Sequence, residues 1–464
     1  MTIATPASVS DEPDGTIVPS NRGGVEKRGI DLIPVGERHG SPRQIGLMWS
    51  GVVLNVQVVV YGALLVGFGL NWWQCVAAIA IGNLTWVITG LCSLAGPAAG
   101  TTTFAINRVP FGGQGNRPIA FFNWIMQLGY EVLDLVLMTL AVTALLALGG
   151  ITPSTPATVA IALGLAVIQS ILPIIGHAAI TRVLRTLVVP FAALFLVLAW
   201  LTAAKLQITA VAPAGWTAFL GGIALAISAS GLGWTPNAAD YSRYLRPDVS
   251  KRALVTAVSI GGALPQCLLM MLGVAVAMVV PAAADPISGL PGAYPIWFVA
   301  PYLVFLIVQM ITLNAVDLYS SGVTLQAIGL RIGRWQAVAL DGVICAVVGL
   351  MVVLSGSFSA FVGNFLLFMI VWFAPWAAIF VVDYALRRGR YDVDLLSGRG
   401  PGFVWAGVAA QAAGMAAALL WLDTTVYTGP LAAATGVDLS APAGLVVGGA
   451  IYYLATRASR RAAA

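Results

Sequence analysis

Charged residues are scarce in this chain. Asp, Glu, Lys and Arg make up 9% of its 464 residues, whereas hydrophobic residues make up 59%. Soluble domains carry about 25% charged residues, so water could not solvate a surface this poor in charge. The composition therefore excludes an ordinary soluble domain and predicts a chain whose main solvent is lipid.

Cysteine and histidine are also few, at four and two residues. The four cysteines lie in apolar stretches without any Cys-x-x-Cys pair, so we expect buried thiols rather than disulfides or a metal site. Because no His or Cys cluster and no Ser–His pair lies at membrane depth, we expect neither an enzyme nor a cofactor. No Walker-type Lys-Ser/Thr sequence follows the glycine-rich stretches, which argues against a nucleotide-driven pump.

Long apolar runs take up most of the chain. A membrane helix needs roughly 20 mostly apolar residues, and an all-α integral membrane protein with twelve transmembrane helices is predicted. The segments are Ile45–Leu70, Cys75–Pro97, Ile119–Leu148, Ala157–Ile175, Ala179–Ala204, Gly215–Ala239, Ala253–Pro281, Pro295–Gln326, Ala337–Leu354, Phe358–Val382, Phe403–Leu422 and Ala441–Ala455.

The basic residues support this count. With twelve spans and a cytoplasmic N-terminus, all of the 23 Lys and Arg residues except Lys205 fall in the tails or in cytoplasmic connections, where membrane proteins concentrate them. The net charge of +5 thus reflects topology rather than a nucleic-acid partner. We expect a multi-pass protein of the plasma (cytoplasmic) membrane, with cytoplasmic tails at 1–43, partly disordered, and 457–464.

Polar residues inside membrane segments are costly and mark functional sites. They concentrate in the first, third, sixth and eighth segments, whereas the fourth, seventh, ninth and eleventh carry almost none. This concentration at mid-membrane favours a carrier of a small polar solute over a channel, which would need a continuous polar stripe on several helices. The candidates include Asn55, Gln57, Tyr130, Glu131, Asp134, Trp234, Thr312 and Asp317.

The sixth segment contains Gly231, Gly233 and Pro236 within six residues, a combination that breaks a helix. The first and sixth segments each open a block of five. Discontinuous helices at matching positions in two halves are typical of transporters with a site at the bilayer midplane. We therefore predict broken first and sixth helices in a five-plus-five inverted repeat, with repeats at 44–204 and 215–383 and two C-terminal helices in 402–456.

Several motifs then occur in one order along the chain. They are Gly96-Pro97-x-x-Gly100, Phe111-Gly112-x-x-Gly115-Asn116, Gly129-Tyr130 and Gly233-Trp234-Thr235-Pro236-x-Ala238-x-Asp240-Tyr241-Ser242-Arg243-Tyr244. From about residue 26 to Asp383, this ordered set resembles the purine and cytosine permeases of the nucleobase–cation symporter-1 family. The resemblance implies a secondary transporter that imports a nucleobase by cation symport with alternating access, on a five-plus-five fold.

The resemblance also implies roles for individual residues. Tyr130 would stack on a flat ring, Trp234 would close its other face, and Asp134 and Asp317 would hydrogen-bond the ring. With the polar residues of the first segment, the predicted substrate-binding set is Asn55, Gln57, Tyr130, Asp134, Trp234 and Asp317. Nearer the cytoplasm, we expect Arg108, Asp240 and Arg243 to act in a gate or in structural ion pairs.

Two departures from the family pattern bear on coupling. Asp134 and Asp317 are acids where many members have Asn, and an ionised carboxylate only accepts hydrogen bonds. Thr312 is followed by Leu313 where sodium-coupled members have adjacent hydroxyls. Because burial favours the neutral form of a carboxyl group, Glu131, Asp134 and Asp317 are candidates for proton coupling, and Thr312 is the remaining candidate for a sodium ligand.

The alternatives left open by the sequence concern the cargo and the ion. The main alternative is a sodium-coupled carrier of the same fold that transports hydantoin, allantoin or a vitamin-type heterocycle. A channel is a more distant alternative. The heterocycle, the choice between proton and sodium, the oligomeric state and the direction of transport do not follow from the sequence.

Overall fold

The computed structural model describes residues 32–175, 177–208, 211–280, 287–330 and 334–462. Most of the predicted N-terminal tail, with Arg22, Lys27 and Arg28, lies outside the described residues. The described part is helical apart from one isolated β-bridge between Asp423 and Thr428. The predicted all-α class is confirmed.

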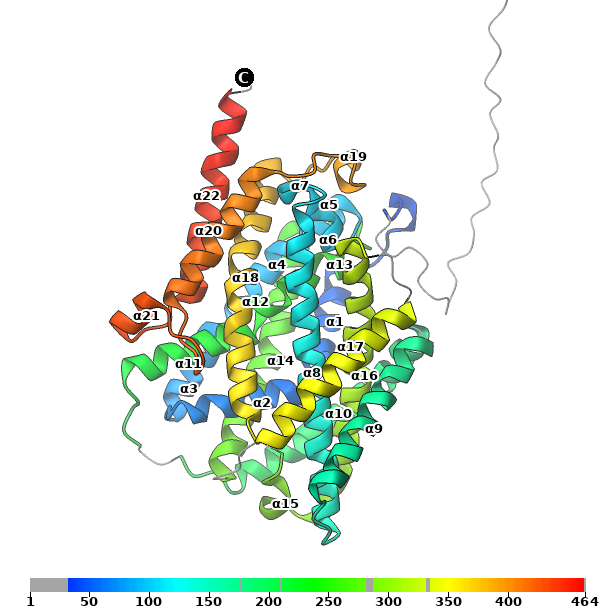
Figure 1. Cartoon of the computed structure of the whole chain (residues 1–464), viewed down its shortest axis with the longest axis vertical. Helices are drawn as coiled ribbons and strands as arrows, with labels where there is room; N and C mark the ends of the chain where they lie inside the picture. The colour runs from blue at the N-terminus through cyan, green and yellow to red at the C-terminus, as the bar shows by residue number, and fades with distance from the viewer. Residues whose placement is uncertain (1–31, 176, 209–210, 281–286, 331–333, 463–464) are drawn as a thin grey trace, which may run out of the picture.

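The first half of the chain contains the following helices (Figure 1). They are η1 (Val35–Glu37), α1 (Pro42–Val53), α2 (Val56–Gly67), α3 (Trp72–Asn83), α4 (Trp86–Ser93), α5 (Ala95–Ala99), α6 (Thr103–Ile106), α7 (Arg108–Phe111), α8 (Asn116–Leu148), α9 (Thr155–Ile175) and α10 (His177–Ala203). The helices α1 and α2 form the first predicted segment, and α3 to α5 form the second.

The second half begins with a run of short helices in the sixth predicted segment. Its helices are α11 (Trp216–Ala229), α12 (Gly231–Trp234), η2 (Thr235–Asn237), α13 (Ala238–Ser242), α14 (Lys251–Val279), α15 (Leu290–Ala293), α16 (Ile296–Ile328), α17 (Arg334–Ser355), α18 (Phe358–Arg387), α19 (Val393–Leu396), α20 (Trp405–Trp421), α21 (Pro430–Thr435) and α22 (Ser440–Ala462).

The helices of the described part are long enough for a multi-pass membrane protein. Seven of its helices are long and apolar enough to cross a membrane, and the bent pair α1–α2 passes the same test as one span. Three shorter apolar helices lie at 155–171, 189–203 and 405–421. With α22 these elements are consistent with the predicted twelve segments.

The first and sixth segments are broken, as predicted. The axes of α1 and α2 meet at 61°, because Leu54 leaves the helical region (φ −78°, ψ 69°) and Asn55 is extended. In the sixth segment Ser230 is non-helical (φ −103°, ψ −147°) between α11 and α12.

A glutamine on α16 closes the first break. Nε2 of Gln309 donates to the carbonyl oxygen of Leu54 at 2.9 Å, and Oε1 accepts from the backbone N–H of Val56 at 3.2 Å. Backbone groups freed by a helix break inside a bilayer need such partners, because no water is available to replace the lost helical bonds. Gln309 therefore makes the break in the first segment tolerable.

The second break is closed by three side chains from neighbouring segments. Gln266 on α14 donates to the carbonyl oxygen of Ala229 at 2.6 Å, and the Thr89 hydroxyl on α4 donates to that of Gly231 at 2.6 Å. The Thr85 hydroxyl accepts from the backbone N–H of Leu232 at 3.2 Å. Both breaks are thus held by tertiary contacts.

The helix contacts follow the predicted inverted repeat. The first segment packs on α14, the seventh, and in the matching position α11 to α13 pack on α3 and α4 of the second. The third and eighth segments, α8 and α16, pack against each other. Small residues allow these close approaches: a Cβ added to Gly62 would lie 1.9 Å from the Met270 carbonyl oxygen, and one added to Gly82 would lie 2.6 Å from Ala226.

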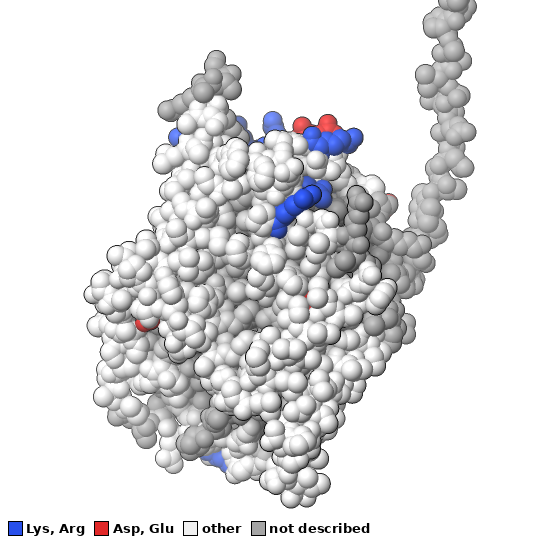
Figure 2. Space-filling model, viewed as in Figure 1, with Lys and Arg blue, Asp and Glu red and all other residues white. Residues whose placement is uncertain are grey.

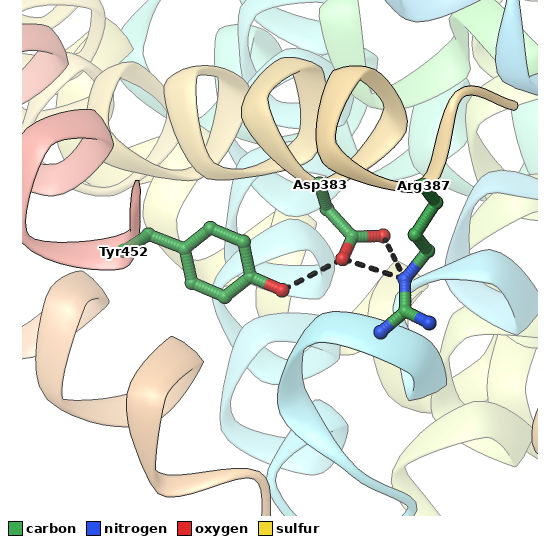
Figure 3. A network of polar contacts seen from close by, with 3 residues as sticks. All are labelled: Asp383, Arg387 and Tyr452. Carbon is green, nitrogen blue, oxygen red and sulfur yellow. Dashed lines mark hydrogen bonds and ion pairs between the residues drawn. The ribbon is translucent and has the colours of Figure 1, made fainter. Parts of the chain in front are cut away.

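The last two long helices form a separate layer. In Figure 1, α20 and α22 lie side by side next to α18, in agreement with the contacts among the three helices. Asp383 on α18 links them: its Oδ1 accepts from the Tyr452 hydroxyl of α22 at 2.7 Å and from Nε of Arg387 at 2.8 Å (Figure 3). This buried acid therefore fixes α22 on α18.

Basic residues gather at one end of the molecule. Figure 2 shows Lys and Arg side chains concentrated at the end that carries α7 and α19, above a broad band of surface with only a few acidic atoms. We call it the basic end. Its position agrees with the charge distribution from which the topology was predicted.

Four segments that the sequence scan treated as nearly apolar contain buried polar residues with structural partners. They are Gln169 on α9, Gln266 on α14, Asp341 on α17 and Gln411 on α20. A single polar residue hardly changes the composition of a long apolar run, yet in lipid it must find a partner. The composition of a segment therefore does not reveal a single buried polar residue that makes structural hydrogen bonds.

Candidate functional site

A cavity lies where the two broken segments meet α8 and α16. Its position follows from the breaks, because α2 and α12 both begin beside it. Polar side chains and aromatic rings from all four predicted segments share its wall. The lining residues are Gln57 on α2, Met126, Gln127 and Tyr130 on α8, Gly233 and Trp234 on α12, Asn237 on η2, and Leu313 and Asp317 on α16.

Two aromatic rings of the lining are held by aromatic neighbours outside it. Tyr130 lies edge-to-face on Phe365, with ring centroids 5.1 Å apart and an interplanar angle of 90°. Trp234 lies edge-to-face on Trp49 at 5.7 Å and 70°. Such contacts fix the orientation of a ring. The orientations of the two rings are thus set by these neighbours.

The first segment supplies an amide that is fixed on both sides. Gln57 donates through Nε2 to Oδ1 of Asp134, and its Oε1 accepts from the Tyr61 hydroxyl at 3.3 Å. Asp134 is fully buried, and its Oδ2 has no hydrogen-bond partner within the described part of the chain. The sequence pattern does not reveal this link between the first and third segments.

The electrostatic character of the cavity is acidic. Asp317 is a lining residue, Asp134 lies one side chain behind the lining, and none of the nine lining residues is Lys or Arg. Ionised carboxylates accept hydrogen bonds and do not donate them. The cavity therefore suits a ligand that presents N–H groups or positive charge.

The structure brings some predicted residues to the cavity and places others elsewhere. Gln57, Tyr130, Trp234 and Asp317 line it, and Asp134 reaches it through Gln57. Their roles in binding stay predictions.

Asn55 and Thr312 are engaged by backbone instead. Asn55 caps α2, since its Oδ1 accepts from the backbone N–H of Val58 at 3.2 Å and its Nδ2 donates to the carbonyl oxygen of Val52 at 2.9 Å. Thr312 is buried, and its hydroxyl donates to the carbonyl oxygen of Val308 at 2.7 Å. Neither residue is part of the lining.

Glu131 lies next to Tyr130 in sequence but is not part of the lining. It is fully buried, and neither carboxylate oxygen has a hydrogen-bond partner among the described residues. It lies within electrostatic range of Asp134, Asp317 and Asp341. The face shared by Tyr130, Glu131 and Asp134 is therefore broad enough to reach beyond the cavity.

The predicted gate residues lie in and beside the connections of the basic end. Oδ1 of Asp240 accepts from the backbone N–H of Thr103 at 2.7 Å, which links the sixth segment to the connection before α8. The guanidinium of Arg243 lies over the Tyr244 ring, 5.1 Å from its centroid. None of these residues lines the cavity.

Arg108 joins two connections of the basic end. Its Nη1 donates to the carbonyl oxygen of Leu396 at 2.8 Å, and partial burial lowers the pKa of its guanidinium from the usual value. Next to it, the backbone N–H of Gln114 donates to the carbonyl oxygen of Gly402 at 2.7 Å. The glycine-rich motif around Gly112 therefore holds the connection before α20.

Two polar lining residues were not among the predicted site residues, Gln127 and Asn237. Gln127 is 3% exposed and makes no hydrogen bond to a described residue, so its amide is available to a ligand. It lies three residues before Tyr130 on the same helix face, a spacing that could have revealed it. Asn237 interacts with the Tyr241 hydroxyl.

Comparison with known families gives a match over most of the chain. The model of a family described as "Permease for cytosine/purines, uracil, thiamine, allantoin" matches residues 32–448. A protein of Bacillus subtilis (strain 168) named as a purine-cytosine permease, YxlA, is 27% identical over 465 aligned positions, which cover 93% of this chain and 95% of that protein.

Solved structures show the same fold. Mhp1, a nucleobase-cation-symport-1 family transporter in a closed conformation with bromovinylhydantoin bound, has a TM-score of 0.72 at 19% identity and covers 93% of this chain and 95% of its own. The inward-facing conformation of Mhp1 has a TM-score of 0.75 at 19% identity and covers 94% and 96%. A manganese transporter of Eremococcus coleocola is less similar, with a TM-score of 0.51 at 14% identity, covering 93% and 97%.

Proposed function

Because the chain belongs to the family of permeases for cytosine/purines, uracil, thiamine and allantoin, we propose that it is a secondary transporter that imports a nucleobase by proton symport. The observation that carries the proposal is the cavity at the two helix breaks. Its lining combines two aromatic rings, each held by an aromatic neighbour, with the carboxyl group of Asp317. Polar groups around a midplane break are the usual site of such transporters.

Tyr130 and Trp234 stack on the two faces of the ring in this proposal. Stacking of an aromatic pair is worth about 0.5–1.5 kcal/mol beyond the buried area. The edge of the ring meets Asp317 and the amides of Gln57 and Gln127. Amides both donate and accept, whereas the carboxylate selects an N–H, so the lining discriminates among heterocycles by their donor pattern.

A proton is the coupling ion in this proposal. Leu313 stands where a second hydroxyl would be needed for sodium, so Thr312 is left as a single hydroxyl ligand. Asp134, by contrast, keeps one oxygen without a hydrogen-bond partner among the described residues. Protonation turns a carboxylate into a donor, so proton and substrate favour each other's binding by linkage.

The two breaks supply the hinges for alternating access. The segments α1–α2 and α11–α13 pack on α14 and on α3–α4, whereas α8 and α16 pack on each other. Rocking of the broken segments against α8 and α16 exposes the cavity first to one side and then to the other. Each of the proposed repeats, at 44–204 and 215–383, then contributes one broken segment and one of the two helices against which the broken segments rock.

The basic end faces the cytoplasm in this proposal, and both termini lie there, in the plasma membrane of the cell. The gathering of Lys and Arg at that end supports this orientation (Figure 2). The cargo then enters from the opposite side and leaves at the basic end.

A second candidate cargo is a cationic or N–H-rich heterocycle such as thiamine or allantoin. The acidic lining without Lys or Arg favours it. The family description includes both compounds.

Direct binding to the purified protein separates the candidates. Cytosine, adenine, hypoxanthine, uracil, hydantoin, allantoin and thiamine are titrated by calorimetry into wild type and Asp317→Asn. Saturable binding of a nucleobase that is weakened in Asp317→Asn supports the proposal. Binding of thiamine or allantoin alone selects the second candidate, and no binding of any compound to the folded protein contradicts both.

A further inference from the structure

A column of polar side chains runs along the packed faces of α8 and α16, beginning near the basic end. On α16 its members are three or four residues apart, which places them on one helix face: Asn314, Asp317, Ser321 and Thr324. On α8 the members are Asn123, Trp124, Glu131 and Asp134, which span eleven residues or about 16 Å along the axis. Only Asp317 belongs to the cavity lining as well.

The part of the column nearer the basic end is crossed by hydrogen bonds between side chains, although Oδ1 of Asn123 has no partner among the described residues. Nδ2 of Asn123 donates to the Thr324 hydroxyl at 3.1 Å. Asp341 on α17 accepts from Nε1 of Trp124 at 3.0 Å and from the Ser321 hydroxyl at 2.5 Å. Asp341 is fully buried, is held in place by these two donors and is not part of the cavity lining.

The end of the column is close to the basic connections. A Cβ added to Gly329, just after α16, would lie 3.3 Å from Cζ of Arg117, just inside the start of α8. Asp341 lies seven residues after the start of α17, a rise of about 10 Å. The Asp341 carboxylate therefore lies about two turns from the end of α17 that begins at the basic end.

The part of the column farther from the basic end contains hydrogen-bond acceptors without donors. Both oxygens of Glu131, Oδ2 of Asp134 and Oδ1 of Asn314 have no hydrogen-bond partner among the described residues, and all three side chains are fully buried. Buried acceptors of this kind are costly unless a proton or a water fills the gap. The Asn314 amide itself is held, because its Nδ2 donates to Oε1 of Gln169 on α9.

The charges around Glu131 are all acidic. The titratable groups within its electrostatic range are Asp134 on its own helix, Asp317 on α16, and Asp341 and Cys345 on α17. No group of three or more His, Cys, Asp or Glu in the described ranges is placed to hold a metal ion. A proton is the ligand that such a set of spaced carboxylates takes.

We propose that the coupling proton passes between the cavity and the basic end through this column, from Asp134 and Asp317 by way of Glu131 to Asp341, on a route separate from that of the substrate. The inference rests on the proposed proton symport. Each step moves H⁺ from one carboxyl group to the next carboxylate, with water or the Ser321 hydroxyl as the bridge. Every donor returns to its ionised form, and no covalent or redox step occurs.

The column explains why acids lie outside the cavity at all. A buried carboxylate without a cationic partner is destabilising, and Asp341 and Glu131 contribute nothing to the cavity lining. Asp341→Asn is a mild test, because Asn keeps the acceptor for Trp124 and can donate to the Ser321 oxygen. It removes only the capacity to carry a proton.

The experiment uses the full chain in liposomes with a radiolabelled cargo identified by binding. Two rates are compared for wild type and Asp341→Asn: exchange at equal pH, which needs no net proton movement, and uptake driven by an inward pH gradient. We expect exchange to stay near the wild-type rate and gradient-driven uptake to fall at least about a hundredfold, the smallest effect typical of a lost proton-transfer group. Glu131→Gln is expected to repeat the pattern, and exposed Asp392→Asn is the matched control.

The possible outcomes distinguish a failure of the proposed proton column from a failure of the proposed proton symport. Gradient-driven uptake by Asp341→Asn and Glu131→Gln at the wild-type rate would overturn the column. Exchange and driven uptake that fall together in both variants would also overturn it, because the acids would then serve binding or folding. Wild-type uptake that ignores the pH gradient would instead overturn the proposed proton symport, which is a separate failure.

Discussion

Gly62 lies at the closest approach between the broken first segment and α14, and Gly62→Ala tests that interface. A Cβ at this position would lie 1.9 Å from the carbonyl oxygen of Met270 and 2.6 Å from its carbonyl carbon. Carbon and oxygen in contact are about 3.3–3.6 Å apart, so α2 and α14 would have to separate by more than about 1 Å. The facing Gly273 is packed as closely, since a Cβ added there would lie 1.9 Å from the Val59 carbonyl oxygen, and this contact would be lost in the same movement.

The expected loss of stability in Gly62→Ala follows from the packing of α2 on α14. A gap of about 0.5–1 Å forfeits a quarter to a half of the dispersion energy of the atoms that face it, and overpacking of a tight interface costs about 1–3 kcal/mol, occasionally more. We therefore expect Gly62→Ala to be destabilised by at least about 1–3 kcal/mol. Thermal unfolding of the purified protein in detergent, followed by tryptophan fluorescence, measures the change.

Gly67→Ala is the matched control on the same helix. Nothing lies within 4 Å of a Cβ added there, and Gly67 is the last residue of α2, so the added methyl is expected to change the stability by no more than about 0.5 kcal/mol. If Gly62→Ala unfolded at the same temperature as Gly67→Ala, the close packing of α2 on α14 would be refuted.

Three further predictions concern single side chains. Gln309→Leu leaves the Leu54 carbonyl and the Val56 N–H without partners, which should lower the free energy of unfolding by about 1–3 kcal/mol for each group; unchanged denaturant unfolding would contradict the bridge. Tyr130→Ala should weaken cargo binding at least about tenfold, equivalent to about 1.4 kcal/mol, while Tyr130→Phe keeps the stacking ring; equal affinity of both variants in calorimetry would exclude stacking. Asp383→Asn should lower thermal stability by about 1–3 kcal/mol without changing cargo affinity, and a changed dissociation constant would show that this network reaches the cavity.

The sequence was sufficient for the class, the breaks and the choice of segments. Polar residues in lipid and glycine or proline in a helix leave a signal that does not depend on the partner. Hence the cavity lies between the four segments that the polarity scan selected, and the family and fold class are confirmed by the comparisons. The repeat boundaries and the roles of the site residues stay predictions.

The sequence could not separate neighbours with the same chemistry. Asn55 and Gln57 are two polar residues two positions apart, yet the first caps α2 and the second reaches the cavity, because the break ends at Asn55. Tyr130 and Glu131 are consecutive, so their side chains point about 100° apart around α8. Glu131 therefore lies outside the cavity lining, on the side of α8 that faces α17. Asp341 was overlooked because its importance depends on Trp124 and Ser321, which only the fold brings to it.

The central claim is that the cavity carries a nucleobase together with a proton. Uptake of radiolabelled cytosine, adenine and hypoxanthine is measured in cells that lack their own nucleobase carriers, with and without sodium. The measurements are made at about pH 5.5 and about pH 7.5, between which the proton concentration differs about a hundredfold. The account predicts uptake that rises at acid pH, ignores sodium and collapses in Asp317→Asn. Uptake that requires sodium and is indifferent to pH, or no uptake of any base by protein shown to be in the membrane, would contradict it.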